Sequence, residues 1–207
     1  MLRNVIFDLG NVLISFKPEE YLIKKNYDKT ERETILSDIF RSREWLLLDN
    51  GDITCDDAIR SIAENSALKT AEITRIFKNR MEIFYPIANN IKLIPELKEQ
   101  GFKLYFLSNF PGDIFPEVRR DYSFFSHFEG GIISADARCS KPDHLIYKTL
   151  LKNYSLQPLE SLYIDDLEVN VKAALSLGMK GIFTHGSEDI SGMVATFLTD
   201  FKEPNAG

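Results

Sequence analysis

The sequence RNVIFDLGNVLIS, residues 3–15, predicts a buried strand that ends at a carboxylate. Residues 5–7 (VIF) are β-branched and aromatic, the types that fill strands buried on both faces of a parallel sheet. Asp8 follows at once, and Gly10 lets the backbone turn and approach a ligand closely. Open α/β sheets bind ligands where strands end in such loops. We therefore interpret Asp8 as a candidate nucleophile and metal ligand, although a solvated aspartate that ends a strand would leave the same pattern.

The composition is that of an ordinary globular protein: the 207 residues are 44% hydrophobic and 27% charged, with a formal net charge of −6. This length suits one domain, or one core with a modest insertion. We do not expect nucleic acid as a partner, because there is no basic run, nor a membrane, because the apolar runs are short. We expect a cytoplasmic protein, because Cys55 and Cys139 form no CxxC pair and no secretory signal precedes the first strand. The sequence makes no prediction of the oligomeric state.

Residues 17–86 have the pattern of a small helical bundle placed directly after the first strand. Apolar residues recur there at helical spacing, and no strand is evident. Thr30 and Glu33 have the spacing of a capping box, and Thr54 suits the cap of a later helix. Four or five such helices would form a bundle. We predict that residues 17–86 are a helical cap domain.

From residue 87 onward, predicted strands and helices alternate. Apolar strand patterns fall at residues 104–107, 131–134, 161–164 and 181–184. This alternation predicts an α/β fold, with a parallel, Rossmann-like sheet covered by helices on both faces. We assign residues 1–16 and 87–207 to this core domain, and its last residues, EPNAG, have the composition of a loose tail.

Polar groups follow the predicted strands or open a predicted helix. They are Asp8, Ser108, Asn109, Lys141, Asp165 and Asp166. Because the ends of parallel strands share one edge of a sheet, these groups are expected to converge on one site. Together they would supply a nucleophile, an oxyanion-binding pair, a cation and a metal-binding pair of carboxylates. Each one alone could be a cap, a solvated lysine or a turn, so the prediction depends on their joint occurrence.

Four stretches resemble, in order, the motifs of the haloacid dehalogenase-like (HAD) hydrolase superfamily. They are FDLGNVL (7–13), FLSN (106–109), KPDHLIY (141–147) and YIDDLEVN (163–170). A helical cap between the first two motifs is similar to the C1-capped branch of that superfamily. The sequence DLGN, in place of the usual Asp-x-Asp, resembles the subgroup that contains bacterial α-glucose-1-phosphate phosphatase. The resemblance implies a Mg²⁺-dependent phosphatase acting on a small phosphorylated metabolite, for example a sugar phosphate such as a hexose-1-phosphate.

The resemblance also implies the roles of the residues at the nucleophile and the metal. Asp8 would attack phosphorus and form an aspartyl-phosphate, as carboxylate nucleophiles do. Mg²⁺ would be held by Asp8, by Asp166 and by the backbone carbonyl of Gly10, an all-oxygen set that suits this ion. Asp165 would lie beside the metal and orient its water shell.

Four further residues would act on the phosphoryl group or support the residues that do. Ser108, the backbone amide of Asn109 and the ammonium of Lys141 would hold the phosphoryl oxygens, with Lys141 also counted as catalytic. Asn170, four residues after the second aspartate of the YIDDLEVN motif, would orient Lys141 or that aspartate.

Gly10 departs from the family pattern. Most phosphatases of the superfamily carry an aspartate there, which protonates the leaving group and then activates water. General acid–base assistance of this kind is worth ~10²–10⁴-fold in rate. Three explanations remain open: an acidic leaving group such as an anomeric hydroxyl, a substitute proton donor, or slow or lost turnover. The candidate substitutes are a metal-bound water and the cap carboxylates Asp49, Asp52, Glu19 and Glu20.

Two other functions fit parts of the sequence. A metal-independent haloacid dehalogenase would also lack the second aspartate, but the Asp165–Asp166 pair and the lack of a halide-binding arginine after Asn11 count against it. A non-catalytic phosphometabolite-binding protein would explain Gly10, although it would have little use for a nucleophile. Trp45 and residues 49–52 (DNGD) are our candidates for reaching the leaving group, although Trp45 fits the core of the bundle better.

Overall fold

The centre of the computed structural model is a five-stranded parallel sheet, and the structure describes residues 1–186 and 188–200. The strands lie in the order β5-β4-β1-β6-β7, with the bounds β1 (Asn4–Phe7), β4 (Lys103–Ser108), β5 (Gly130–Ile133), β6 (Ser161–Asp165) and β7 (Lys180–Phe183). The chain moves from β1 out to β4 and β5, then crosses back to β6 on the other side of β1. Phe7 pairs with both Phe106 and Ile164. Asp8 therefore follows the central strand, where the order of the sheet reverses and such folds bind ligands.

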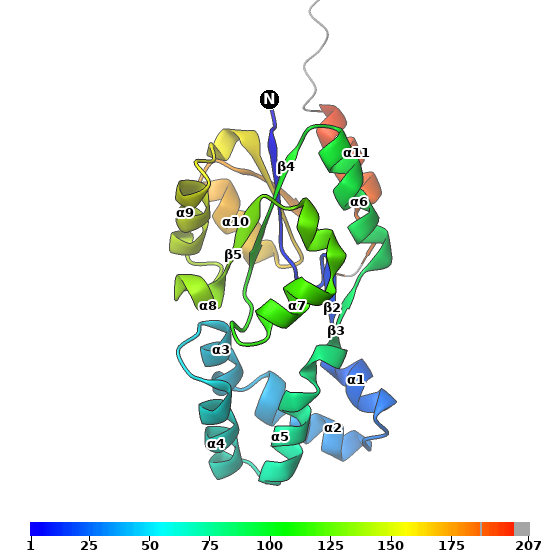
Figure 1. Cartoon of the computed structure of the whole chain (residues 1–207), viewed down its shortest axis with the longest axis vertical. Coiled ribbons are helices and arrows are strands. Elements are labelled where there is room, and N and C mark those ends of the chain that lie inside the picture. The colour runs from blue at the N-terminus through cyan, green and yellow to red at the C-terminus, as the bar shows by residue number, and fades with distance from the viewer. Residues whose placement is uncertain (187, 201–207) are drawn as a thin grey trace, which may run out of the picture.

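Helices cover both faces of this sheet, as Figure 1 shows. Successive strand residues point to opposite faces, so Phe7 and Ile6 belong to different apolar clusters. The cluster of Phe7 includes residues of α6 (Ala88–Glu99), α7 (Phe115–Asp121), η3 (Ser123–His127) and α11 (Ser191–Asp200). The cluster of Ile6 includes residues of α9 (His144–Asn153) and α10 (Glu168–Ser176). The prediction of an α/β fold with both faces covered is confirmed.

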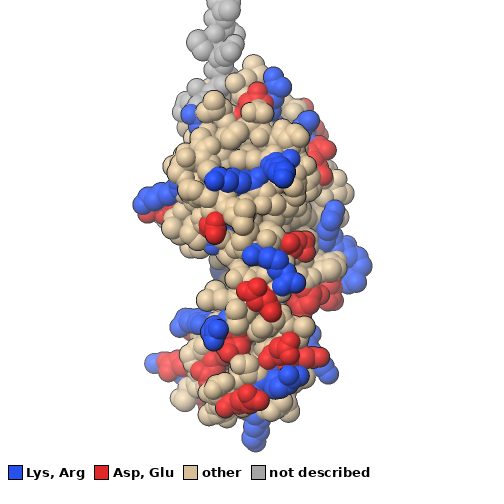
Figure 2. All heavy atoms as spheres, turned by 90° about the vertical axis from the view of Figure 1, so that its left-hand side faces the viewer, with Lys and Arg blue, Asp and Glu red and all other residues tan. Residues whose placement is uncertain are grey.

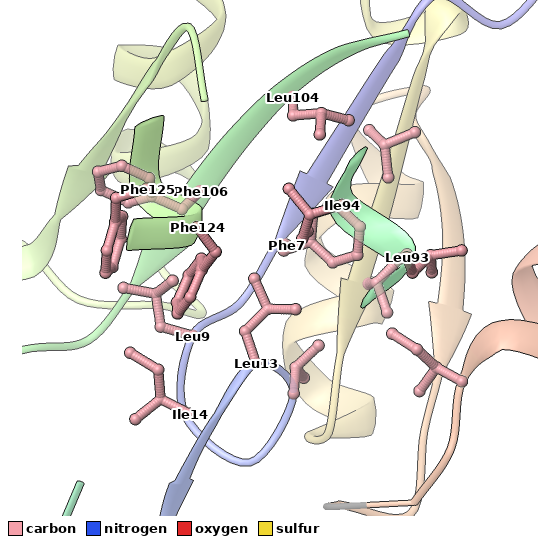
Figure 3. Packing of buried hydrophobic residues seen from close by; sticks show 14 of the residues in the cluster. Phe7, Leu9, Leu13, Ile14, Leu93, Ile94, Leu104, Phe106, Phe124 and Phe125 are labelled. Carbon is pink, nitrogen blue, oxygen red and sulfur yellow. The ribbon is translucent and has the colours of Figure 1, made fainter. Parts of the chain in front are cut away.

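The loop after β1 is anchored by its apolar side chains. Leu9, Leu13 and Ile14 are fully buried in the same cluster as Phe7, and Figure 3 shows them below the end of the strand. Burying a side chain of this size stabilises a fold by ~1.5–3 kcal/mol. The loop that carries Asp8 is therefore a packed part of the core.

The helices between β2 (Ile14–Phe16) and β3 (Phe84–Pro86) form a second body, in the lower half of Figure 1. They share a separate apolar cluster that includes Trp45. Their bounds are α1 (Pro18–Lys24), α2 (Lys29–Ile35), η1 (Leu36–Phe40), α3 (Arg43–Asp49), α4 (Cys55–Asn65), α5 (Thr70–Lys78) and η2 (Arg80–Ile83). We propose that this body is the cap of residues 17–86 and that the rest is the core, whose tail EPNAG lies outside the described residues.

The antiparallel pair of β2 and β3, which joins the two bodies, was not predicted. Each strand has three residues, too few for a period-two pattern to emerge from the sequence. The capping box proposed for Thr30 and Glu33 was also wrong. The side chain of Asp28 accepts a hydrogen bond from the backbone of Glu31 instead, and the helix starts earlier. Thr54 caps α4 as predicted.

Two predictions around the third core strand need correction. Lys141 does not open a helix, because Asp143 is the N-cap of α9: its carboxylate accepts from the amide of Leu145 at 2.8 Å. Lys141 therefore lies in the preceding loop. The strand predicted at residues 131–134 is β5, and Ser134 instead begins the short helix α8 (Ser134–Ala137). A single turn, η4 (Pro158–Glu160), precedes β6.

The surface carries both signs of charge. On the face shown in Figure 2, lysines and arginines alternate with acidic residues over both bodies. None of the helices in the described part of the chain is both long and apolar enough to cross a bilayer.

Candidate active site

Asp8 lies at the end of β1 and lines a cavity of about 210 Å³ between the two bodies. Its amide donates to the carbonyl of Ile164 at 2.8 Å, and its Oδ1 accepts from the amide of Leu9 at 2.7 Å. Within the described residues its Oδ2 makes no hydrogen bond, so this oxygen is available to a ligand. The cavity lining includes most of the predicted site residues, namely Asp8, Gly10, Ser108, Asn109, Lys141, Asp166 and Asn170.

Lys141 joins two of the predicted aspartates. Its ammonium lies 2.8 Å from Oδ1 of Asp8 and 2.7 Å from Oδ2 of Asp165. The side chain of Lys141 is 2% exposed and that of Asp165 is fully buried, so water does little to screen these charges. The Asn109 side chain holds the backbone of Lys141: it accepts from the amide at 2.8 Å and donates to the carbonyl at 3.1 Å. Lys141 is therefore held both at its backbone and at its ammonium group.

Asp165 is held by donors on both oxygens. Besides Lys141, the hydroxyl of Tyr163 donates to Oδ2, and the amide of Leu167 donates to Oδ1 at 2.8 Å. The Asn170 side chain donates to both oxygens, at 3.0 and 3.1 Å. Asn170 therefore contacts Asp165, whereas we expected it to orient Lys141 or Asp166. With its lone pairs occupied, Asp165 is suited to position Lys141 and poorly suited to bind a metal.

Asn11 supports the second aspartate of the pair, a contact that the sequence did not indicate. Its side-chain amide donates to Oδ2 of Asp166 at 3.2 Å, and its Oδ1 accepts from the amide of Phe16 at 3.1 Å. Asn11 has a φ of 53°, a left-handed conformation in which asparagine is enriched. The one sequence feature that could have drawn attention to Asn11 is its position directly after a glycine in a turn.

The carboxylates of Asp8, Asp165 and Asp166 each offer an oxygen within 4.8 Å of the others. Burial raises the pKa of Asp8, and the ammonium of Lys141 opposes that rise while the neighbouring carboxylates add to it. Burial and the charge of Asp165 likewise raise the pKa of Asp166. One ammonium faces three carboxylates, which leaves an excess of negative charge. A divalent cation on oxygen ligands would balance that excess, so the site fits Mg²⁺.

Aromatic rings form much of the remaining cavity wall. Phe16 lies 5.8 Å from Trp45 and 5.3 Å from Phe84, and Phe84 lies 5.0 Å from Phe110, measured between ring centroids. All four residues line the cavity. Trp45 is buried in the apolar cluster of the cap as well, so it serves both of the places considered for it.

The cap also contributes one carboxyl group to the cavity. Of the four acidic residues considered as proton donors, Asp49 lines the cavity, at the end of α3. The other three, Asp52, Glu19 and Glu20, are exposed and are not part of its lining as the structure describes it.

The sequence matches known proteins over most of its length. The profile of the family described as haloacid dehalogenase-like hydrolase matches residues 5–184. The sesquiterpene phosphatase astK of Aspergillus oryzae is 29% identical over 180 residues, covering 87% of this chain and 88% of that protein. A phosphoglycolate phosphatase of Vibrio vulnificus is 24% identical over 127 residues, covering 59% of this chain and 54% of that protein.

A solved structure shares the fold. It is a HAD family enzyme from Bacteroides thetaiotaomicron in complex with magnesium and inorganic phosphate, with a TM-score of 0.73 and 23% identity. The alignment covers 93% of this chain and 99% of that one. The α-glucose-1-phosphate phosphatase subgroup stays a prediction. The matched family profile extends from the first strand of the sheet to the last, so this chain belongs to the haloacid dehalogenase-like hydrolases and is an enzyme of that class.

Proposed function

We propose that this chain is a magnesium-dependent phosphatase that hydrolyses a small phosphorylated metabolite through an aspartyl-phosphate intermediate. The observation that carries the proposal is the arrangement around Asp8. Its Oδ1 is paired with Lys141 at 2.8 Å, its Oδ2 has no partner among the described residues, and a carboxyl oxygen of Asp166 is close by. Relatives named as phosphatases support it.

In this proposal the core residues bind and attack the phosphoryl group. An oxygen of Asp8 forms the new bond to phosphorus, and the bond to the leaving oxygen breaks. The hydroxyl of Ser108, the backbone amide of Asn109 and the ammonium of Lys141 hold the phosphoryl oxygens as charge develops on them. Asp165 keeps the ammonium of Lys141 in position, because without Asp165 the ammonium would be paired with Asp8 alone.

The proposed magnesium ligands are Asp8, Asp166 and the carbonyl of Gly10. When bound there, Mg²⁺ supplies the positive charge that lets a dianionic phosphate approach a carboxylate. Asn11 fixes the orientation of Asp166 through the 3.2 Å hydrogen bond. The magnesium and phosphate complex of the Bacteroides enzyme, which has the same fold, supports this choice of metal.

The aromatic wall indicates what the leaving group looks like. A hexose-1-phosphate remains our proposed substrate, because a sugar ring can stack on Phe16, Trp45 or Phe84. The same wall favours a second candidate, the phosphate ester of an apolar alcohol, and the sesquiterpene phosphatase among the relatives supports that choice. Both leaving groups present an apolar surface to rings that are themselves apolar.

The test is a screen for phosphate release from sugar, nucleotide, cofactor and isoprenoid monophosphates, with Mg²⁺ and with EDTA. We expect Mg²⁺-dependent release from one of these classes. We expect Asp8→Asn to remove it with the far-UV spectrum unchanged, by at least ~10⁴-fold as for other nucleophiles. Release of halide from haloacids in EDTA would instead favour the dehalogenase, and tight binding of a phosphate ester without turnover would favour the binding protein.

Cys55 and Cys139 are unpaired thiols, so we also propose a cytoplasmic location.

A further inference from the structure

Gly10 leaves a space beside the nucleophile where the family usually has an acid. A Cβ atom built on Gly10 would lie 3.9 Å from Oδ2 of Asp8, an ordinary contact, and the backbone there is not in a left-handed conformation. The position could therefore hold a side chain without strain, yet it holds none. A proton donor for the leaving group has to come from another part of the molecule, and it has to reach the same cavity.

Asp49 of the cap reaches that cavity. Among the described residues, the carboxylic acids in its lining are Asp8, Asp49 and Asp166, and the first and last already have roles. Asp49 lines the cavity together with Phe16 and Trp45, which belong to the wall that we propose for the leaving group. It is thus the cap residue placed to meet an oxygen that departs from phosphorus.

One oxygen of the Asp49 carboxyl group is buried and unpaired. Its Oδ1 is shielded from solvent and has no hydrogen-bond partner in the part of the chain that the structure describes. Burial raises its pKa to about 7. Asp49 is also the last residue of α3, where the exposed carbonyl ends of the helix disfavour a negative charge. The other charged groups in the cavity lining are Asp8, Asp166 and Lys141. A carboxyl group in this state can donate a proton near neutral pH and take one back.

The end of α3 and the loop that follows it are docked on the core. The hydroxyl of Ser134 donates to the carbonyl of Asp49, and the guanidinium of Arg138 donates to the carbonyl of Gly51 at 2.5 Å. Gly51 has a φ of +70°, and a Cβ there would lie 2.8 Å from the carbonyl oxygen of Ala135. The fit therefore requires glycine, and it holds Asp49 at a defined place over the site.

We propose that Asp49 is the general acid–base catalyst of this enzyme, supplied by the cap in place of the side chain missing at residue 10. The inference rests on the proposed phosphatase function. In the first step Asp8 bonds to phosphorus, the bond to the leaving oxygen breaks, and Asp49 gives that oxygen its proton. In the second step a water oxygen bonds to phosphorus, Asp49 takes a proton from that water, and the bond to Asp8 breaks. The products are the alcohol and inorganic phosphate, and Asp49 is protonated again.

The test compares leaving groups in the variant Asp49→Asn. The nitrophenolate of p-nitrophenyl phosphate leaves without a proton, whereas an alkoxide does not. With p-nitrophenyl phosphate we expect a burst of one equivalent at close to the wild-type rate, followed by slow turnover, because the second step still lacks its base. With an alkyl or sugar phosphate we expect the first step itself to slow by ~10²–10⁴-fold. Asp52→Asn, in the same loop but exposed, is the matched control and should match the wild type on both substrates.

Rescue at the original position sharpens the result. In the Asp49→Asn background, Gly10→Asp should restore ~10-fold or more of the lost turnover, since a Cβ atom at position 10 meets only an ordinary contact. Equal slowing of the first step with both leaving groups, or no slowing of turnover with either, would overturn the role of Asp49 while wild-type turnover upholds the phosphatase. A wild-type protein that releases no phosphate from any ester, with or without Mg²⁺, would end both proposals.

Discussion

On the core side of the cavity every charged side chain is held by hydrogen bonds, whereas the carboxyl that the cap contributes is held by none within the described residues. Asp165 accepts from Lys141, Tyr163, Leu167 and Asn170. Asp49, by contrast, has an oxygen that is both buried and unpaired. The two sides of one cavity thus differ in how far their charges are satisfied.

The difference follows from what each side has to do. Residues that bind a phosphoryl group must keep one arrangement throughout the reaction, and buried hydrogen bonds provide it. A proton donor must change its state twice in each cycle, and a carboxyl group without fixed partners can do so near its own pKa. We therefore expect substitutions on the core side to lower the stability of the protein, and substitutions on the cap side to lower its activity.

The largest expected effect is on the core side. Lys141→Met should lower the free energy of unfolding by ~3–5 kcal/mol, because it leaves the carboxylates of Asp8 and Asp165 buried without a cation. Urea denaturation measures this. The control is Lys172→Met, which removes an exposed pair with Glu168 and should change stability by less than ~1 kcal/mol. Similar losses in the two variants would mean that the buried network is not what stabilises the core.

An intermediate effect, of opposite sign, is expected at Asp49. Its folded-state pKa of about 7 lies above the value of ~3.9 expected when unfolded, so the folded state holds the proton more tightly. The stability that this group contributes is complete below pH ~4 and is lost as the pH rises through 7. Asp49→Asn should therefore be more stable than the wild type by ~2–4 kcal/mol at pH 8, and by much less at pH 5.

Urea denaturation of both proteins at the two pH values checks this, with Asp52→Asn as the exposed counterpart. A difference between Asp49→Asn and the wild type that does not change with pH would show that the carboxyl of Asp49 is ionised as easily in the folded protein as in the unfolded one.

The smallest expected effect concerns the docking of the cap. Gly51→Ala places a side chain at φ +70° and against Ala135, so it should cost ~1–2 kcal/mol in stability. It should also slow turnover by ~10–100-fold, because Asp49 is displaced from the leaving group. Gly101→Ala has a comparable φ of +88° but meets no atom within 4 Å, and it lies outside the cap. It should lose stability without losing activity, and equal activity in the two variants would argue against docking as the reason Gly51 is needed.

Much of the core side of the site could be predicted from the sequence because most of its residues lie at the ends of strands. Asp8, Ser108 and Asp165 stand at the ends of apolar runs, and the geometry of a parallel sheet then brings them together. The contacts that fix them could not be predicted. The hydrogen bond from Asn11 to Asp166 joins residues 155 positions apart, and no local pattern encodes it.

The cap side was less accessible for the same reason. Four acidic residues in the cap were equally suitable as proton donors on sequence alone. What singles out Asp49 is its place in the cavity lining, which depends on the docking of the end of α3 on α8, a contact across more than eighty positions that involves the backbone of Gly51. The strands β2 and β3 also escaped prediction, because a three-residue strand leaves too little pattern.

The placement of these two strands decides how the molecule can open. Figure 1 shows the β2–β3 ribbon on one side of the junction and α3, with its docked loop, on the other. Both covalent links between the bodies run through the ribbon, so a rotation of one body against the other would pivot there. In such a rotation Phe16 and Phe84, which belong to the ribbon, would move less than Asp49 at the end of α3. A substrate that enters while the bodies are apart would meet Phe16 and Phe84 first, and the carboxyl group of Asp49 only after the bodies have closed.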